Sequence, residues 1–125
     1  MSFSRLAAVA ALSVIGFSPA AAQPAASVTI TAWSYGFAPN PIRLAAGRPV
    51  TLVFVNRSGS SHDFTASAFF AASSISAGAA PGGEIELGGH ETKSVTLVPR
   101  AGTYPAHCSH FLHSAFGMKD TIVVN

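Results

Sequence analysis

Residues 50–65 read VTLVFVNRSGSSHDFT, and this stretch determines how the rest of the chain is interpreted. Its first seven residues, 50–56, are apolar and rich in β-branched side chains, which predicts a buried strand. A polar loop follows, and extended structure begins again at residues 62–65. A strand, a polar turn and a second strand indicate a sheet protein.

Segments of the same kind recur on both sides of this stretch. Turn signals rich in Gly and Pro separate them every eight to twelve residues or so. A short helix is expected around residues 68–72, within an Ala- and Ser-rich stretch. Seven to eight short strands with this spacing predict one all-β sandwich domain. Besides 50–56 and 62–65, the expected strands are 28–33, 42–44, 84–87, 94–98, 103–107 and 121–124.

The first 22 residues have the parts of a secretory signal peptide. Arg5 precedes an apolar run over residues 6–17, and small residues end the segment at Ala22. That run is shorter than the ~20 residues that a membrane-spanning helix needs. We expect cleavage after Ala22, which leaves a periplasmic or otherwise exported domain of residues 23–125 with no membrane span.

The charge of the chain excludes one class of partner. Seven Lys and Arg residues stand against five Asp and Glu residues, and no basic run occurs. Nucleic-acid binding requires a concentrated basic surface, so we expect no nucleic-acid partner. We expect the domain to be a monomer.

The soft metal donors are few and lie close together. Cys108 is the only cysteine, and Met118 is the only methionine besides Met1. A lone thiol in an oxidising compartment forms no internal disulfide and needs another occupant. His113 lies midway between Cys108 and Met118, and His62 opens a strand after a polar loop. A thiolate, two imidazoles and a weak thioether suit copper that cycles between Cu+ and Cu2+.

The spacing Cys108-x4-His113-x4-Met118, followed by a final strand, resembles the copper loop of cupredoxins, in the longer-loop form of the rusticyanin or phytocyanin kind. The loop before His62 and the motif FAPNPI at residues 37–42 are similar to other parts of these domains. The resemblance implies a Greek-key β-sandwich that holds one copper ion. It implies that His62, Cys108 and His113 are equatorial ligands and that Met118 is the axial ligand.

Three further residues are expected beside the ligands. Asp63 is expected to bond to Ser109 or to its amide, because such bonds orient metal ligands. His110 has three interpretations: an exposed loop residue, a neighbour of the ligands, or a ligand that competes with Met118.

Zinc is the alternative metal, although structural zinc sites use more than one Cys and no Met.

Phe111 and Leu112 are apolar residues directly before His113. They are candidates for a patch that receives a redox partner protein, because exposed apolar clusters tend to mark interaction sites. With four ligands in place no position is open for a substrate, so we expect no enzyme activity and predict a one-electron carrier. A protein that captures and delivers copper is the alternative. A red or green copper centre with an exchangeable ligand is a third possibility.

Overall fold

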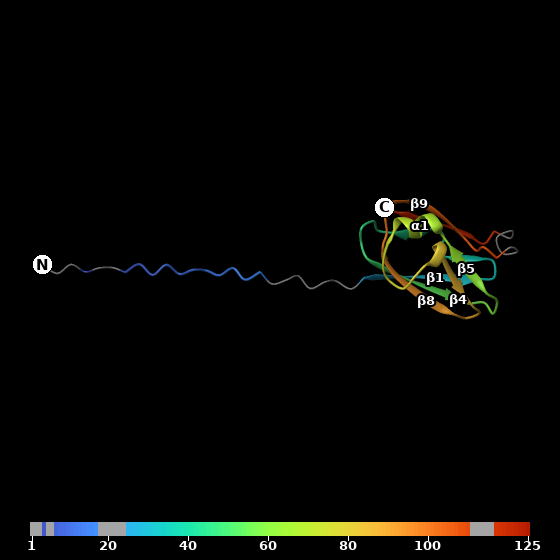
Figure 1. Ribbon diagram of the computed structural model, residues 1–125, viewed down its shortest axis with the longest axis horizontal. Coiled ribbons are helices and arrows are strands. Elements are labelled where there is room, and N and C mark those ends of the chain that lie inside the picture. The colour runs from blue at the N-terminus through green and yellow to red at the C-terminus, as the bar shows by residue number, and fades with distance from the viewer. Residues whose placement is uncertain (1–3, 5–6, 18–24, 111–116) are drawn as a thin grey trace.

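The computed structural model describes residues 4, 7–17, 25–110 and 117–125, and its strands form two packed five-stranded sheets (Figure 1). The first sheet has the order β2-β1-β4-β8-β6, with bounds Gly36–Ala38, Ala26–Trp33, Val50–Asn56, Thr92–Val98 and Ser74–Ala77. The second has the order β3-β10-β9-β5-β7, with bounds Ile42–Leu44, Lys119–Val124, Gly102–His107, His62–Thr65 and Glu84–Leu87. The predicted all-β sandwich is confirmed.

Alternation along the strands builds the core between the two sheets. In β4 every second residue is buried, from Val50 to Asn56, as expected for a strand with one face toward the core. Phe54 and Phe64 come from opposite sheets, and their ring centroids lie 5.0 Å apart. Phe37 meets Phe64 edge to face, with centroids 5.2 Å apart. These aromatic contacts hold the sheets together.

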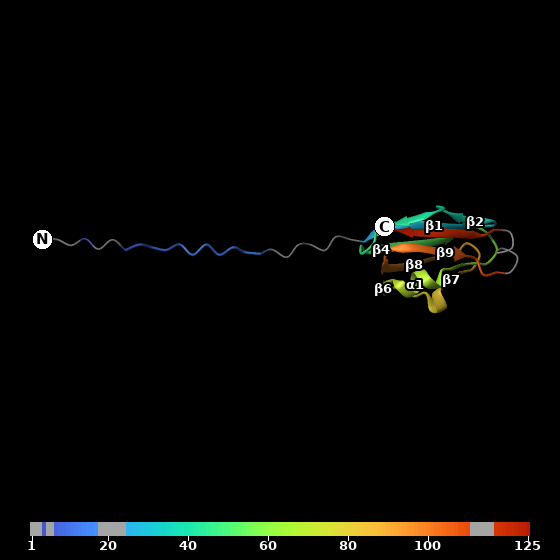
Figure 2. The same cartoon turned by 90° about the horizontal axis from the view of Figure 1, so that it is seen from above.

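The predicted short helix is present as α1, Ser67–Ala72, and a 3-10 turn follows at Pro81–Gly83. The helix buries Phe69 and Phe70 against the sandwich. The backbone N–H of Ser73 donates to the Phe69 and Phe70 carbonyls and ends the helix. Figure 2 shows α1 with β6 and β7 at one edge of the sandwich.

The structure adds two strands to the eight that we predicted. β2 lies where we expected a turn, and it pairs with only the last residues of β1. All four residues of β6 are exposed, and its sequence SISA alternates over only four residues within an Ala- and Ser-rich stretch. Backbone pairing with β8 is what makes it a strand. Such edge strands leave little signal in side-chain pattern.

The end of the sandwich that carries β5 and the loop after β9 is set by strand register. Thr65 pairs with His107, in antiparallel strands. Continuing that register places Asp63 opposite Ser109. Lys119 pairs with His107 on the other side of β9. The start of β5, the end of β9 and the start of β10 therefore meet at one end of the domain.

Residues 7–17 lie outside the sandwich and carry no helix or strand (Figure 1). Their large side chains are exposed, from Ile15 at 78% to Phe17 at 93%. Among the residues that the structure describes, no helix is long and apolar enough to cross a membrane.

Replacing Phe64 with Ala should lower the free energy of unfolding, because the ring lies fully buried between the sheets. Loss of a buried Phe costs about 3–5 kcal/mol. Urea denaturation followed by far-UV circular dichroism measures the change. Tyr35→Ala is the control, since Tyr35 is 65% exposed and should cost less than about 1 kcal/mol. Equal losses in the two variants would contradict this account of the core.

Candidate metal centre

His62 and Cys108 meet at one end of the sandwich. His62 is the first residue of β5, and Cys108 directly follows β9. Both side chains are fully buried, and the Cys108 Sγ lies 4.0 Å from the His62 Nδ1. Metal–sulfur and metal–nitrogen bonds of about 2.3 and 2.0 Å can bridge that distance around one ion. The approach of these two donors, on which the sequence interpretation depended, is present.

Met118 also lies buried at this end of the domain. The Cys108 N–H donates to the Met118 carbonyl at 3.0 Å, so the two sulfur-bearing residues stand opposite one another. Gly117, just before Met118, has φ +84°. Side chains other than that of glycine are strained in this left-handed region. A glycine therefore shapes the turn into Met118.

The other predicted ligand, His113, lies outside the described residues, as do Phe111 and Leu112. Their roles as ligand and as partner patch stay predictions. The described part of the chain supplies a thiol, an imidazole and a thioether from three separate positions.

Asp63 ties the two donor segments together. Its Oδ1 accepts hydrogen bonds from the Ser109 N–H at 2.8 Å and from the Thr65 hydroxyl at 2.8 Å. Its Oδ2 accepts a short hydrogen bond from the Ser109 hydroxyl. The carboxylate is 1% exposed. The expected bond between Asp63 and Ser109 is present, and it fixes the start of β5 against the residue after Cys108.

His110 lies beside this link. Its Nε2 is 3.1 Å from the Glu86 Oε1 and 3.6 Å from the Asp63 Oδ2. Among the three interpretations of His110, this position favours a neighbour of the ligands. Sequence reasoning missed Glu86, because its place opposite Asp63 depends on the β5–β7 register. Alternation in the predicted strand 84–87 showed only that Glu84 and Glu86 share a face.

The environment of Cys108 suits a metal-bound thiolate more than a free one. Burial raises the pKa of the Cys108 thiol, while backbone hydrogen bonding at Asp63 and His110 opposes this rise. A buried thiol with a raised pKa stays protonated near neutral pH, and a bound cation replaces that proton. Cys108 is therefore not an activated, reactive cysteine.

Asn56, at the end of β4, holds the loop that leads into His62. Its side-chain N–H groups donate to the carbonyls of Ser60 at 2.8 Å and Gly88 at 2.9 Å, with a longer bond to Leu87. Its Oδ1 accepts from the N–H and hydroxyl of Ser58, both at 3.0 Å. Asn56 is buried, and sequence reasoning had placed it only as the start of a polar loop.

A second buried acidic group follows Met118. Asp120 is 5% exposed, and its Oδ1 accepts from the Thr121 N–H at 2.7 Å. Its Oδ2 has no hydrogen-bond partner among the described residues. Burial raises the pKa of Asp120 to about 6, against the opposing effect of the Thr121 bond. Sequence reasoning missed this group, although residue 120 faces inward with Ile122 and Val124.

The fold and these donors define a class of protein, and the comparison with protein families gives the same answer. The family described as "Cupredoxin-like domain" matches residues 5–124, almost the whole chain. The chain belongs to the cupredoxin-like family, and the resemblance that we drew from its motifs is confirmed. A search of curated proteins finds no match.

Solved structures with the same fold include three auracyanins. Auracyanin B is 25% identical, with a TM-score of 0.58 over 83% of this chain and 91% of that one. Auracyanin of the photosynthetic bacterium Roseiflexus castenholzii, reduced with dithionite, is 17% identical, with a TM-score of 0.60 over 82% and 99%. Auracyanin A, a "blue" copper protein of the green thermophilic photosynthetic bacterium Chloroflexus aurantiacus, is 24% identical, with a TM-score of 0.54 over 79% and 99%. The matches to the last two structures, which are less than 25% identical to this chain, show only that the fold is shared.

Replacing Asn56 with Ala should destabilise the domain by about 2–4 kcal/mol, because a buried amide is lost and several backbone groups of the loop lose their partner at once. Thermal and urea unfolding of the metal-free protein measure this loss. Asn40→Ala is the matched control, since the Asn40 amide makes one exposed bond of 3.2 Å to the Lys119 carbonyl. That variant should change stability by less than about 1 kcal/mol. A loss in Asn56→Ala no larger than in the control would show that the amide does not hold this loop.

Proposed function

We propose that this protein binds one copper ion through His62, Cys108, His113 and Met118 and serves as a one-electron carrier. The observation that carries the proposal is the 4.0 Å approach of the buried Cys108 Sγ and His62 Nδ1. Two comparisons support copper: the chain belongs to the cupredoxin-like family, and it shares its fold with auracyanin A, which is described as a "blue" copper protein. Copper bound here would supply a reversible one-electron couple.

The donor set favours copper over zinc. One thiolate, imidazoles and a buried thioether are soft and intermediate donors, a combination that suits both oxidation states of copper. Structural zinc sites use several thiolates or imidazoles without a thioether. Met118 is fully buried at the site, where a thioether that did not meet a metal would serve only as packing.

The surroundings of the donors favour electron transfer over catalysis. The described donors lie at the ends of paired strands, and the Asp63–Ser109 bonds fix the His62 and Cys108 segments against each other. A rigid donor set changes little when the metal charge changes, so each electron transfer needs little rearrangement. Four protein donors also leave no coordination position for a substrate.

The partner and the location follow from the same proposal. A redox protein would dock on a patch formed by Phe111 and Leu112, next to the predicted ligand His113. Residues 1–22 would direct export and be removed, so the carrier would act in the periplasm.

Copper capture and delivery is the second candidate function. The observation that favours it is the contact of His110 with Glu86 beside the Cys108 segment, because an exposed imidazole–carboxylate pair can meet a metal in solution. A delivery protein would release copper readily to a chelator, whereas a carrier would keep it through reduction and reoxidation.

Addition of one equivalent of Cu2+ should produce an intense absorption band toward the red end of the visible spectrum, because a thiolate transfers charge to copper in a trigonal site. Cys108→Ser should abolish the band. His90→Asn, a change of an exposed histidine at a turn, should leave it unchanged. A pale spectrum from the copper-loaded wild-type protein would refute the proposed ligand set. Loss of copper to a chelator on each reduction would favour the delivery function.

Replacing Asp63 with Asn should raise the midpoint potential of the copper centre. The carboxylate stabilises the more positive oxidised ion, and the neutral amide does not. We expect a rise on the order of 40–80 mV, which corresponds to about 1–2 kcal/mol of charge–charge interaction. Protein-film voltammetry measures it. Glu91→Gln is the control, because Glu91 is exposed and pairs with Lys93. The midpoint potential of the copper centre in this variant should equal that of the wild-type protein. No change, or a fall, in Asp63→Asn would rule out this electrostatic role.

A further inference from the structure

Three arginines lie at the end of the sandwich opposite the proposed copper ligands. Arg43 is the middle residue of β3, Arg48 lies in the turn before β4, and Arg100 lies in the connection between β8 and β9. The Gly47 N–H donates to the Pro99 carbonyl at 3.0 Å, so this turn and this connection are in contact. All three arginines are exposed. We refer to Arg43, Arg48 and Arg100 as the basic end of the domain.

The direction of the strands separates the basic end from the metal donors. Arg100 precedes β9, whereas Cys108 directly follows it. Arg48 precedes β4, and the loop that leads into His62 follows that strand. The length of a strand therefore lies between these arginines and the donors.

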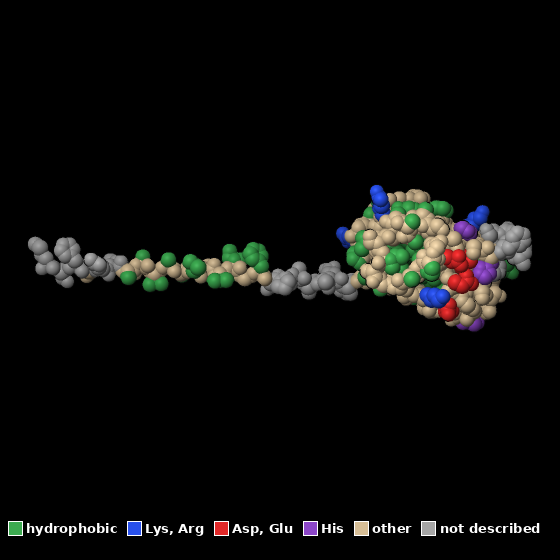
Figure 3. Space-filling model, viewed as in Figure 1, with side chains coloured by type: hydrophobic (Ala, Val, Ile, Leu, Met, Phe, Trp, Pro, Cys, Tyr) green, Lys and Arg blue, Asp and Glu red, His purple; other side chains and the backbone are tan. Residues whose placement is uncertain are grey.

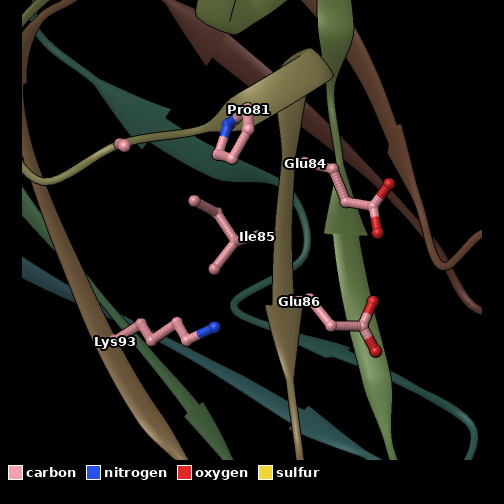
Figure 4. A pocket seen from close by; sticks show the side chains of 6 residues that line it. Pro81, Glu84, Ile85, Glu86 and Lys93 are labelled. Carbon is pink, nitrogen blue, oxygen red and sulfur yellow. The ribbon is translucent and has the colours of Figure 1, made fainter.

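The acidic side chains lie away from the basic end. Figure 3 shows acidic side chains toward the far end of the domain, and Lys or Arg side chains where the N-terminal segment joins. Figure 4 shows two of the acidic residues, Glu84 and Glu86, which line a pocket with Lys93. The strand pairing and the backbone contacts place all five acidic residues of the chain in the half that holds the metal donors: Asp63, Glu84, Glu86, Glu91 and Asp120.

The charges of the basic end are therefore available to an outside partner. In the part of the chain that the structure describes, no ion pair joins Arg43, Arg48 or Arg100 to a carboxylate. Asn125 also lies here, since its backbone oxygen accepts from the Ala46 N–H at 2.9 Å. A terminal carboxylate at Asn125 would offset one of the three positive charges, so this end stays basic.

A groove of about 260 Å³ lies beside two of the arginines. Arg43 and Arg48 both line it, and its apolar lining residues include Val28, Leu44 and Pro49. A guanidinium group can bind a phosphate through two parallel N–H donors. Two such groups beside apolar side chains suit a ligand that carries phosphate next to hydrocarbon. Phospholipids have this chemistry.

The chain before β1 joins the domain at the same end. Ala26, the first residue of β1, pairs with Val50, which lies two residues after Arg48. The predicted leader therefore connects here, and the large apolar side chains of residues 7–17 are exposed (Figure 1). A leader that enters a membrane during export brings the attached end of the domain to the membrane surface. This position favours a membrane over an acidic protein as the partner.

We propose that the basic end binds the surface of a membrane that contains anionic phospholipids. Arg43 and Arg48 contact lipid phosphates beside the groove, and Arg100 adds charge from the neighbouring connection. The attraction of a basic side chain to an anionic bilayer falls off within a Debye length, so the end that faces the membrane contributes most. In this orientation the end with the metal donors points away from the lipid, where a redox protein can reach it. That last consequence rests on the proposed function.

Sedimentation with lipid vesicles tests the binding. Metal-free protein, expressed from the complete sequence, should bind vesicles of equal parts phosphatidylglycerol and phosphatidylcholine, and added salt should weaken the binding. The triple variant Arg43→Gln, Arg48→Gln, Arg100→Gln should bind at least tenfold more weakly. The matched control removes three exposed basic residues from the other half of the domain and should bind within twofold of the wild-type protein: Arg57→Gln, Lys93→Gln, Lys119→Gln.

Two results of this experiment would overturn the proposal. One is equal binding by the two triple variants, and the other is equal binding of the wild-type protein to vesicles of phosphatidylcholine alone. A variant with Lys at positions 43, 48 and 100 keeps the charge and should bind within fivefold of the wild-type protein. If it loses binding as the Gln variant does, charge is not the cause and the proposal fails. Far-UV circular dichroism checks that each variant is folded.

Trp33 reports the orientation of the bound domain. It is the only tryptophan of the chain, it is 46% exposed, and it ends β1, the strand that Ala26 begins at the basic end. If the basic end faces the membrane, acrylamide should quench the Trp33 fluorescence equally in free and vesicle-bound protein. Protection of Trp33 on vesicles would show that the opposite end docks, and would overturn the proposal.

Failure of this proposal can be distinguished from failure of the proposed function. Vesicle binding is measured without copper, and the thiolate absorption band is measured without lipid. If the band is absent but vesicles bind through the three arginines, the copper centre fails and the basic end stands. If neither kind of vesicle binds but poly-glutamate binds through the same arginines, the partner is an acidic protein and the membrane proposal fails.

Discussion

The hydrogen bonds between Asp63 and Ser109 are the interaction on which the site depends. His62 begins β5 and Cys108 directly follows β9 in the same sheet, and the recorded backbone pairing between these two strands is at Thr65 and His107, away from both donors. The buried Asp63 carboxylate accepts hydrogen bonds from both the N–H and the hydroxyl of Ser109. These side-chain bonds hold the two segments in the same register as the strand pairing. The same carboxylate places negative charge beside the donors. One residue therefore supplies both alignment and electrostatic bias.

Much of this arrangement could be predicted from sequence, and the exceptions have a physical reason. A polar loop before His62 and a Gly- and Pro-containing turn before residue 103 mark the strands beside His62 and Cys108, and the donor types with the family resemblance predicted that the two donors meet. Glu86 could not be placed, because its position opposite Asp63 is a property of strand register, which one sequence leaves open. β6 was not predicted, because its four residues SISA are a short signal within an Ala- and Ser-rich stretch. His113 was assigned from spacing and family resemblance, and that assignment stays a prediction.

Rigidity at the metal end comes from more than one contact. Asn56 holds the loop before His62 to the end of β7, and the His90 N–H donates to the Ser58 carbonyl at 3.0 Å. A side chain at Gly89 would collide with the backbone of Gly59, so the two loops lie in direct contact. This network fixes the loop that leads into His62. The donor is thus positioned before any ion arrives, which is the preorganisation that a metal centre of constant geometry requires.

The distance along the chain between the two central donors has a consequence for how the protein is made. His62 and Cys108 are 46 residues apart in the sequence. The last strand, β10, pairs with β3, which lies early in the sequence. Contacts between such remote segments form late and slow the search for the native state. The chain must therefore complete most of its topology before the thiol and the imidazole become neighbours. Metal added to the nascent or denatured polypeptide would meet donors that are far apart, whereas metal added after folding would meet donors that are already close together.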